Sequence, residues 1–259
     1  MTKEQELSGG NASGHVVRIG GTVRKPWTAA TPSVFAYMEA LRLVGVELPA
    51  PMGRDEQGRQ VTEFVEGELA MGGEPLTLVE LAEVGALVRQ IHDASAGFSP
   101  ARDAVWETAI EAPGDELICH NDLAPWNLRR GERWVFIDWD AAAPSTRLWD
   151  LAYAVQAFTL TDPQQTPKVA AEALSSFVSG YCADAQLRVE LPEALVDRAW
   201  AMFSMLERSY REGCEPWATM FVEGHGDHWQ TVAQYVERNR EVWRAALSGA
   251  SSQTDNSDC

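Results

Sequence analysis

The chain of 259 residues carries 38 Asp and Glu against 21 Lys and Arg, a formal net charge of −17. Such a charge repels the nucleic-acid backbone and favours cationic ligands, so we expect no nucleic-acid partner. No run approaches about 18 consecutive apolar residues, so we expect no membrane-spanning helix. The polar first residues lack the apolar core of a signal peptide, which predicts a cytoplasmic protein.

Short β-rich segments dominate the first quarter of the chain. Two strands joined at paired glycines are predicted over 15–20 and 21–26. Apolar residues then recur at helical spacing over 31–45, and two further strands around a turn follow within 50–65. The order of strands, helix and strands predicts a small N-terminal nucleotide-binding lobe over residues 1–64.

A glycine-rich, acidic connector is predicted at 65–75, and the chain turns helical after it. Thr77 and Glu80 have the spacing of a capping box, which places a helix start there. Apolar positions at helical spacing continue through 76–250, the predicted catalytic and substrate lobe. The polar tail, 251–259, is expected to be disordered. The sequence therefore predicts an α+β protein with a small β-rich lobe and a larger, mainly helical lobe.

Cysteine and histidine give little support for a metal site of their own. The four cysteines show no CxxC spacing, so we expect free thiols rather than a zinc site. His225 and His228 lie near Glu223 and Asp227, which leaves a metal cluster open. A polar loop before a helix is the interpretation that the sequence favours.

The stretch ICHNDLAPWNLRRGERWVFIDWD, residues 118–140, is typical of a strand, a loop and a second strand. Asp122 and Asn127 lie five residues apart on the loop, and Asp138 ends the second strand eleven residues later. Carboxylate and carboxamide oxygens suit Mg²⁺, which leaves its other positions to water and phosphate oxygens. The pattern predicts that Asn127 and Asp138 hold Mg²⁺ against a nucleotide, while Asp122 accepts the proton of a hydroxyl group.

The same residues carry a resemblance to a known family. HNDLAPWN followed by IDWD resembles the catalytic and metal-binding motifs of the aminoglycoside phosphotransferase family, which shares the protein-kinase-like fold. Asn121 stands where the usual motif of the family has glycine, and RLWDLAY, 147–153, resembles the element that follows. The resemblance is specific in 118–153 and extends over roughly residues 7–240, because the order of the lobes also fits. It implies a bilobal protein-kinase-like fold.

The resemblance also assigns roles to individual residues. Asp122 matches the catalytic base of the family, and Asn127 and Asp138 match the two Mg²⁺ ligands. His120 is expected to brace the loop, and Asp150 to cap a helix and hydrogen-bond the loop. Asp140 matches an acidic residue that either adds to the site or faces solvent.

In this fold the nucleotide, ATP or GTP, binds between the lobes. LSGGNASGHVVRIG resembles a nucleotide loop between two strands, with Gly9, Gly10 and Asn11 at its tip, although the same residues also suit a common turn. Arg24 is the residue we select as the basic phosphate contact. Lys25, which would point to the other face of the strand, stays open as an alternative.

The helix at 31–45 departs from the family pattern. A glutamate that pairs with the basic residue is expected one turn into the helix, where the chain has Val34. Glu39 lies more than a turn later. An arginine, always charged and bidentate, needs such a partner less than a lysine does.

The connector resembles the hinge on which adenine rests. The resemblance makes Thr62 the gatekeeper and assigns the backbone C=O of Glu63 and the backbone N–H of Val65 to the adenine edge.

The sequence thus predicts an enzyme that moves the γ-phosphoryl group of ATP to a hydroxyl of a small molecule, such as an aminoglycoside-like antibiotic. Glu223 and Asp227 are candidates for holding a cationic group of this acceptor. The alternative is a non-catalytic binding or immunity protein against a toxin or antibiotic. The three motif residues favour the enzyme, and Val34 favours the binding protein.

Overall fold

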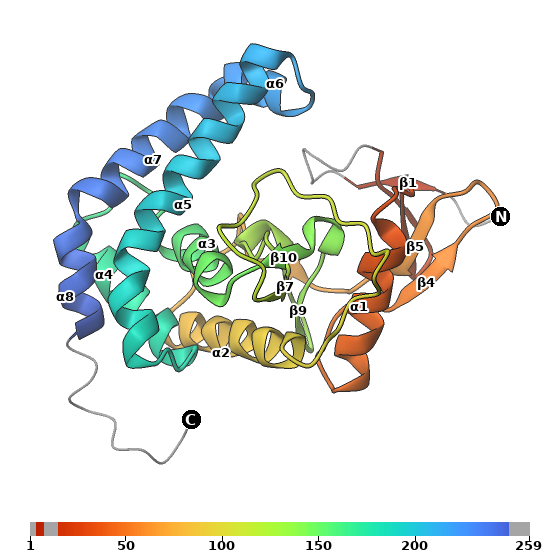
Figure 1. The fold of residues 1–259 in the computed structure, drawn as a ribbon, viewed down its shortest axis with the longest axis horizontal. Helices are drawn as coiled ribbons and strands as arrows, with labels where there is room; N and C mark the ends of the chain where they lie inside the picture. The colour runs from red at the N-terminus through yellow and green to blue at the C-terminus, as the bar shows by residue number, and fades with distance from the viewer. Residues whose placement is uncertain (1–3, 8–14, 249–259) are drawn as a thin grey trace.

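The computed structural model describes residues 4–7 and 15–248. The predicted nucleotide-loop tip, Gly9, Gly10 and Asn11, and the predicted tail, 251–259, lie outside the described residues. Figure 1 shows a β-sheet with one helix at one end of the molecule and a larger, mainly helical part at the other. The predicted α+β class is confirmed.

One antiparallel sheet forms the N-terminal lobe. Its order is β1-β2-β3-β5-β4. The strands are β1 (Gln5–Glu6), β2 (Val17–Ile19), β3 (Thr22–Lys25), β4 (Pro51–Arg54) and β5 (Gln60–Glu63). Strands β3 and β5 are paired so that Val23 lies opposite Thr62 and Lys25 opposite Gln60. Because side chains alternate along a strand, this register decides which residues of β3 face the C-terminal lobe.

Helix α1 (Thr31–Leu43) connects the sheet to the other lobe through its apolar face. Val34, Tyr37 and Leu41 are buried on this face at helical spacing. The hydroxyl of Tyr37 donates to the backbone C=O of Ile118 at 2.9 Å. The sequence motif that begins at Ile118 is therefore packed directly against α1.

Eight helices and two small sheets make up the described part of the C-terminal lobe. The helices are α2 (Leu78–Ser95), α3 (Arg147–Thr159), α4 (Pro167–Gly180), α5 (Ala185–Glu212), α6 (Trp217–Met220), a π-helical turn (Phe221–His225), α7 (Gly226–Arg238) and α8 (Arg240–Ser248). The capping box predicted for α2 is present: Thr77 accepts from the backbone N–H of Glu80, whose side chain accepts from the N–H of Thr77. No helix within 15–248 has both the length and the apolar content to cross a membrane.

The two small sheets hold the sequence motif. β7 (Leu117–Cys119) pairs with β10 (Ala143–Ser145), and β8 (Leu128–Arg130) lies between β6 (Glu68–Leu69) and β9 (Trp134–Phe136). Short 3-10 turns occupy Pro125–Asn127 and Trp139–Ala141. The predicted connector therefore contains a strand, β6, that binds it to the motif. Cys119 and Cys214 are free thiols, whereas Cys182 is disulfide-bonded, so the expectation of free thiols was wrong for Cys182.

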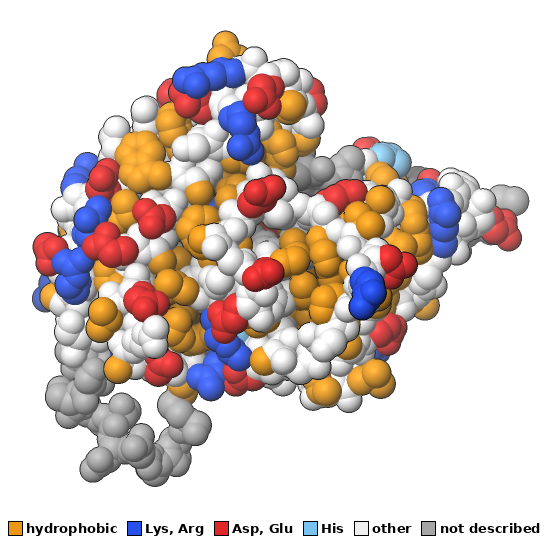
Figure 2. All heavy atoms as spheres, viewed as in Figure 1, with side chains coloured by type: hydrophobic (Ala, Val, Ile, Leu, Met, Phe, Trp, Pro, Cys, Tyr) orange, Lys and Arg blue, Asp and Glu red, His pale blue; other side chains and the backbone are white. Residues whose placement is uncertain are grey.

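The last helices extend away from the body of the lobe. In Figure 1, the end of α5, α6 and the start of α7 form an arm. The face in Figure 2 shows acidic and basic side chains interspersed over these helices, so the net charge is not gathered into one acidic patch on that face.

Helices α2 and α4 meet through two glycines. A Cβ atom on Gly85 would lie 2.1 Å from the backbone oxygen of Phe177, and one on Gly180 would lie 1.9 Å from the backbone oxygen of Ala82. Side chains at these positions would force the two backbones apart.

We expect Gly85→Ala to lower the free energy of unfolding by about 1–3 kcal/mol, because overpacking at a backbone contact outweighs the better helix propensity of alanine. Urea unfolding measures this change. Gly97→Ala is the control, since its Cβ would lie 3.6 Å from the nearest atom and should change stability by less than about 0.5 kcal/mol. Equal stability of the two variants would contradict the assigned packing.

Candidate active site between the lobes

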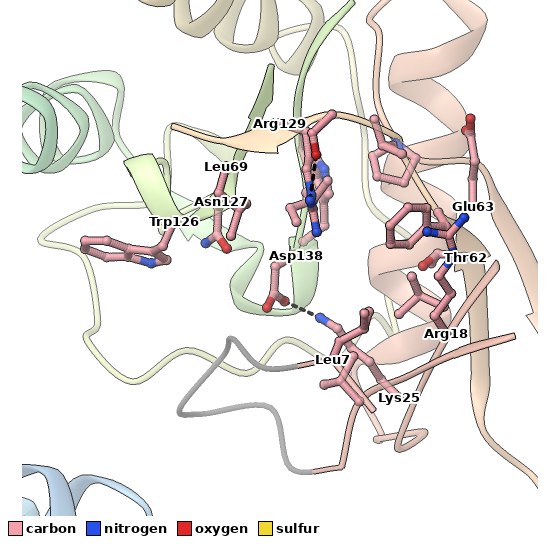
Figure 3. A pocket seen from close by; sticks show the side chains of 18 of the residues that line it. Leu7, Arg18, Lys25, Thr62, Glu63, Leu69, Trp126, Asn127, Arg129 and Asp138 are labelled. Atoms are coloured by element: carbon pink, nitrogen blue, oxygen red, sulfur yellow. Dashed lines mark hydrogen bonds and ion pairs between the residues drawn. The ribbon is translucent and has the colours of Figure 1, made fainter. Parts of the chain in front are cut away.

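A cavity of about 690 Å³ lies between the N-terminal sheet and the motif, which is a size typical of small-molecule sites. Lys25 and Thr62 line it from the sheet, and Asn127, Arg129 and Asp138 line it from the opposite lobe. Figure 3 shows Asn127 and Asp138 together on one wall, with Lys25 extending toward Asp138 from the other. Two of the three motif residues are thus brought to one cleft.

The third motif residue, Asp122, is not among the residues that line the cavity, but it contacts Asn127, which does. Its Oδ2 accepts from Asn127 Nδ2 at 2.8 Å, and its Oδ1 accepts from the hydroxyl of Tyr153 at 2.8 Å. Asn127 Nδ2 also donates to the backbone C=O of Asp122 at 3.0 Å. The amide of Asn127 therefore uses its nitrogen on Asp122 and leaves its oxygen to face other partners.

Burial raises the pKa of Asp122 above its ordinary value, and the hydrogen bonds from Tyr153 and Asn127 oppose this shift. Burial also raises the pKa of Tyr153, and the nearby negative charge of Asp122 adds to this effect. Tyr153 therefore remains a hydroxyl donor at neutral pH. A half-buried carboxylate with a raised pKa and a fixed orientation suits proton transfer.

The loop that carries Asp122 is fixed from below by buried groups. Asp150 Oδ1 accepts from the backbone N–H of Asn121 at 2.9 Å, and Asp150 Oδ2 is 3.0 Å from His92 Nε2. His120 Nε2 donates to the C=O of Ile137 at 3.1 Å while its Nδ1 accepts from the N–H of Asp122 at 3.2 Å. The predicted loop contacts of His120 and Asp150 are present. The predicted cap is wrong, because the N-terminal cap of α3 is Thr146, whose hydroxyl accepts from the N–H of Trp149.

Asn121 has a left-handed backbone conformation, with φ 63°. Asparagine adopts this conformation more readily than other residues with a side chain, so it can replace the usual glycine. Its Nδ2 also donates to the C=O groups of Cys119, Ala141 and Ala143 at 3.2–3.4 Å. The substitution thus adds contacts between the loop of Asp122 and the segment that follows Asp138.

A cluster of charges joins the two lobes. The ammonium of Lys25 contacts Asp138 Oδ1 and lies 3.0 Å from Asp140 Oδ2. Burial alone would lower the pKa of Lys25, but the attraction of the two carboxylates outweighs it and raises the pKa above its ordinary value. Asp138 itself has the left-handed conformation, φ 61°, at the turn after β9. This turn directs Asp138 and Asp140 toward the same ammonium group.

The selection of Arg24 as the basic residue of the cleft was wrong, and Lys25, the alternative, lines the cavity. Arg24 Nη1 donates to the hydroxyl of Thr22, and its Nε lies 3.4 Å from Asp55 Oδ2. The reason is the alternation of side chains along β3. Two adjacent basic residues in the sequence carry no signal that decides which of them faces the cleft.

The predicted hinge residues lie along the cavity. Thr62, Glu63 and Val65 all line it. The side chain of Glu63 is directed elsewhere: one oxygen pairs with Arg133 and the other accepts from the N–H of Ala50 at 3.1 Å. Only the backbone of Glu63 is then left to contact a nucleotide base, as the hinge interpretation requires.

The candidate acceptor residues, Glu223 and Asp227, lie on the arm, in the π-helical turn and the first turn of α7. Both are exposed, and neither lines the cavity. Their role stays a prediction. Within 4–7 and 15–248, the grouping of three possible metal-ligand atoms is instead His92, Cys119 and Asp150, all buried, of which His92 and Asp150 share the contact described above.

Sequence reasoning missed several groups at the site. Tyr153 bonds Asp122, Gln60 bonds Asp140, and Arg129 lines the cavity between the lobes. Tyr153 lies three residues beyond Asp150 on α3, and helical spacing could have suggested that both face the motif. Gln60 and Arg129 carry no comparable signal, because their placement depends on strand pairing.

The profile of the family described as "Phosphotransferase enzyme family" matches residues 99–191, which include the whole motif. This segment is similar to the phosphotransferase enzyme family. The resemblance drawn from the sequence is thereby confirmed. A curated relative, the "Trifolitoxin immunity protein" of Rhizobium leguminosarum bv. trifolii, is 32% identical over 162 residues. That match covers 60% of this chain and 61% of the relative, so the chain spans about three fifths of the relative's length.

Solved structures share the fold at low identity. An amicoumacin kinase solved with AMP-PNP and Ca²⁺ has a TM-score of 0.67 and 12% identity, and the match covers 92% of this chain and 88% of that one. A microcompartment-associated aminopropanol kinase has a TM-score of 0.63 and 16% identity, with coverage of 95% and 94%. The predicted kinase-like fold is confirmed.

The loop geometry gives a stability test of Asn121. We expect Asn121→Ala to cost about 2–3 kcal/mol, since it loses hydrogen bonds and places alanine in the left-handed region. Asn121→Gly should cost about 1 kcal/mol less, because glycine accepts this backbone conformation. Denaturant unfolding of both variants measures the difference. A glycine variant less stable than the alanine variant would contradict the backbone argument.

Proposed function

We propose that the chain transfers the γ-phosphoryl group of a magnesium–nucleotide, ATP or GTP, to a hydroxyl of a small molecule. The observation that carries the proposal is the joint placement of Asn127 and Asp138 on one wall of the cavity (Figure 3), together with the hydrogen bond from Asn127 to Asp122. One buried acid alone has many structural explanations. A base and two oxygen ligands at one cleft are the parts that phosphoryl transfer needs.

The donor groups fit a magnesium ion. Asp138 offers a carboxylate, and the amide oxygen of Asn127 is free of the Asp122 contact because the nitrogen makes that bond. Mg²⁺ takes few protein oxygens and keeps its other positions for water and phosphate. When bound, the magnesium–nucleotide supplies a transferable phosphoryl group with part of its charge neutralised.

The residues of the chain would perform four tasks. Asp122 accepts the proton of the acceptor hydroxyl, and Tyr153 holds one oxygen of Asp122 in place. Lys25, on the N-terminal lobe, contacts the phosphates, and the backbone of Glu63 and Val65 holds the base of the nucleotide. The acceptor binds toward the C-terminal helices, where Glu223 and Asp227 on the arm are the candidates for holding a cationic group.

A second candidate function is immunity against a toxin without phosphoryl transfer. It is favoured by the relative named "Trifolitoxin immunity protein" and by the absence of an acidic partner for Lys25 on α1. In this case the cleft would bind its ligand without turnover. The retained geometry around Asp122 argues for the enzyme, since binding alone does not need an oriented base.

Nucleotide consumption by the purified chain with Mg²⁺ tests the proposal. ATP and GTP are compared against a panel of aminoglycosides, other hydroxylated antibiotics and small amino alcohols. Acceptor-dependent turnover that Asp122→Ala loses supports the transferase. Nucleotide binding without turnover across the panel favours the binding protein.

Asp122→Ala should lower kcat by about 10²–10⁴-fold and leave nucleotide affinity nearly unchanged, because the variant loses proton transfer but keeps the cavity wall. Asp138→Ala should abolish use of the magnesium–nucleotide. Steady-state kinetics and calorimetry separate the two effects. Wild-type activity in Asp122→Ala would rule out this residue as the base.

The raised pKa of Asp122 predicts a pH dependence. The base acts as a carboxylate, so kcat/KM should be constant above the raised pKa and fall as the pH drops through it. Tyr153→Phe removes a hydrogen bond that lowers this pKa, so the acid limb of the profile should move to higher pH. An acid limb that stays in place in Tyr153→Phe would show that the limb does not report Asp122.

A further inference from the structure

The partner of Lys25 is missing from the element where the kinase-like pattern expects it. Helix α1 contains one acidic residue, Glu39, which is half-exposed and lies 3.7 Å from Arg42 of the same helix. The expected position is Val34, which is 2% exposed and packed in the apolar core. Helix α1 therefore offers no carboxylate to the ammonium of Lys25.

Asp140 makes two hydrogen bonds that suit it to replace the carboxylate that α1 lacks. Its Oδ2 accepts from Lys25 Nζ at 3.0 Å, and its Oδ1 accepts from Gln60 Nε2 at 3.1 Å. Gln60 is 3% exposed and also donates to the backbone C=O of Pro26 at 3.1 Å. Lys25 and Gln60 are cross-strand neighbours on β3 and β5, so the sheet presents two donors to one carboxylate.

We propose that Asp140, oriented by Gln60, is the positioning residue that anchors Lys25 in place of the helical glutamate. This inference rests on the proposed function, in which Asp138 is drawn toward the metal. Lys25 then loses one of its two carboxylates, and Asp140 remains to hold the ammonium in the cleft. The anchor comes from the C-terminal lobe, so the orientation of Lys25 depends on how the two lobes meet rather than on the position of α1.

The conformation of the turn after β9 explains why Asp140 can reach the N-terminal sheet. Asp138 adopts the left-handed conformation, and Trp139–Ala141 forms a 3-10 turn directly after it. Trp139 is buried, and its indole N–H donates to the C=O of Phe136 at 2.9 Å. With Trp139 fixed in the core, the residues on either side of it are both directed toward the cleft.

A double-mutant cycle on unfolding tests the anchor without any nucleotide. Asp140→Asn should lower the midpoint of thermal unfolding by about 2–4 °C. In a Lys25→Met background the same change should have no effect or raise the midpoint, because without the ammonium the carboxylates of Asp138 and Asp140 only repel each other. Glu39→Gln, which removes the one carboxylate of α1, is the matched control and should leave the midpoint unchanged.

Calorimetry with ATP and GTP in EDTA tests the consequence for binding. Asp140→Asn should raise the dissociation constant about tenfold, the size expected for loss of a charged hydrogen bond, and should add nothing in the Lys25→Met background. Gln60→Leu should act in the same direction with a smaller effect. Glu39→Gln should bind like the wild type.

Two results would overturn the anchor. One is an Asp140→Asn variant with wild-type midpoint and wild-type affinity in EDTA. The other is weaker binding only when Mg²⁺ is present, which would make Asp140 a metal ligand instead. If the wild type binds no nucleotide, the proposed function fails, and the unfolding cycle still decides whether Asp140 anchors Lys25.

Discussion

The ammonium of Lys25, set between the carboxylates of Asp138 and Asp140, is the interaction on which the arrangement of the cleft depends. Two half-buried acids two residues apart repel each other and are costly unless a cation lies between them. Because the lysine comes from the N-terminal sheet and the acids follow β9, neutralising this charge also fixes the sheet over the motif. The cleft is therefore closed by electrostatics on one side and by the packing of α1 on the other.

The C-terminal side of the cleft, around the loop of Asp122, is held by different interactions from the N-terminal side, around Lys25. Asp150 and Asn121 hold the loop of Asp122 by buried hydrogen bonds, and these bonds are strong where water is excluded. The N-terminal side of the cleft is held by the ion cluster of Lys25, Asp138 and Asp140, in which phosphate groups could replace the carboxylates as partners of Lys25. Under the proposed function, this difference keeps the base rigid while leaving Asp138 able to exchange the lysine for a metal ion. Preorganised groups of this kind supply most of the rate in phosphoryl transfer.

The sequence predicted those parts of the structure that depend on local spacing. The capping box at Thr77 and the helix that begins at Thr31 follow from residue type and periodicity, whereas Asn127 and Asp138 were selected from the spacing of the motif. The choice of Arg24 failed because pairing with neighbouring strands decides which side chains of a short strand face the cleft. Two adjacent basic residues do not show from the sequence which of them takes that face. The role of Gln60 could not be predicted either, because it depends on the pairing of β3 with β5, a contact between residues far apart in sequence.

The crystal structure of the chain with a non-hydrolysable nucleotide and Mn²⁺, with the manganese located by its anomalous signal, tests the central claim most directly. The account predicts a manganese ion held by Asn127 and Asp138, phosphates at Lys25 and the base against Glu63 and Val65, with Asp140 still on Lys25. A nucleotide bound elsewhere, or a metal ion that contacts neither Asn127 nor Asp138, would contradict it.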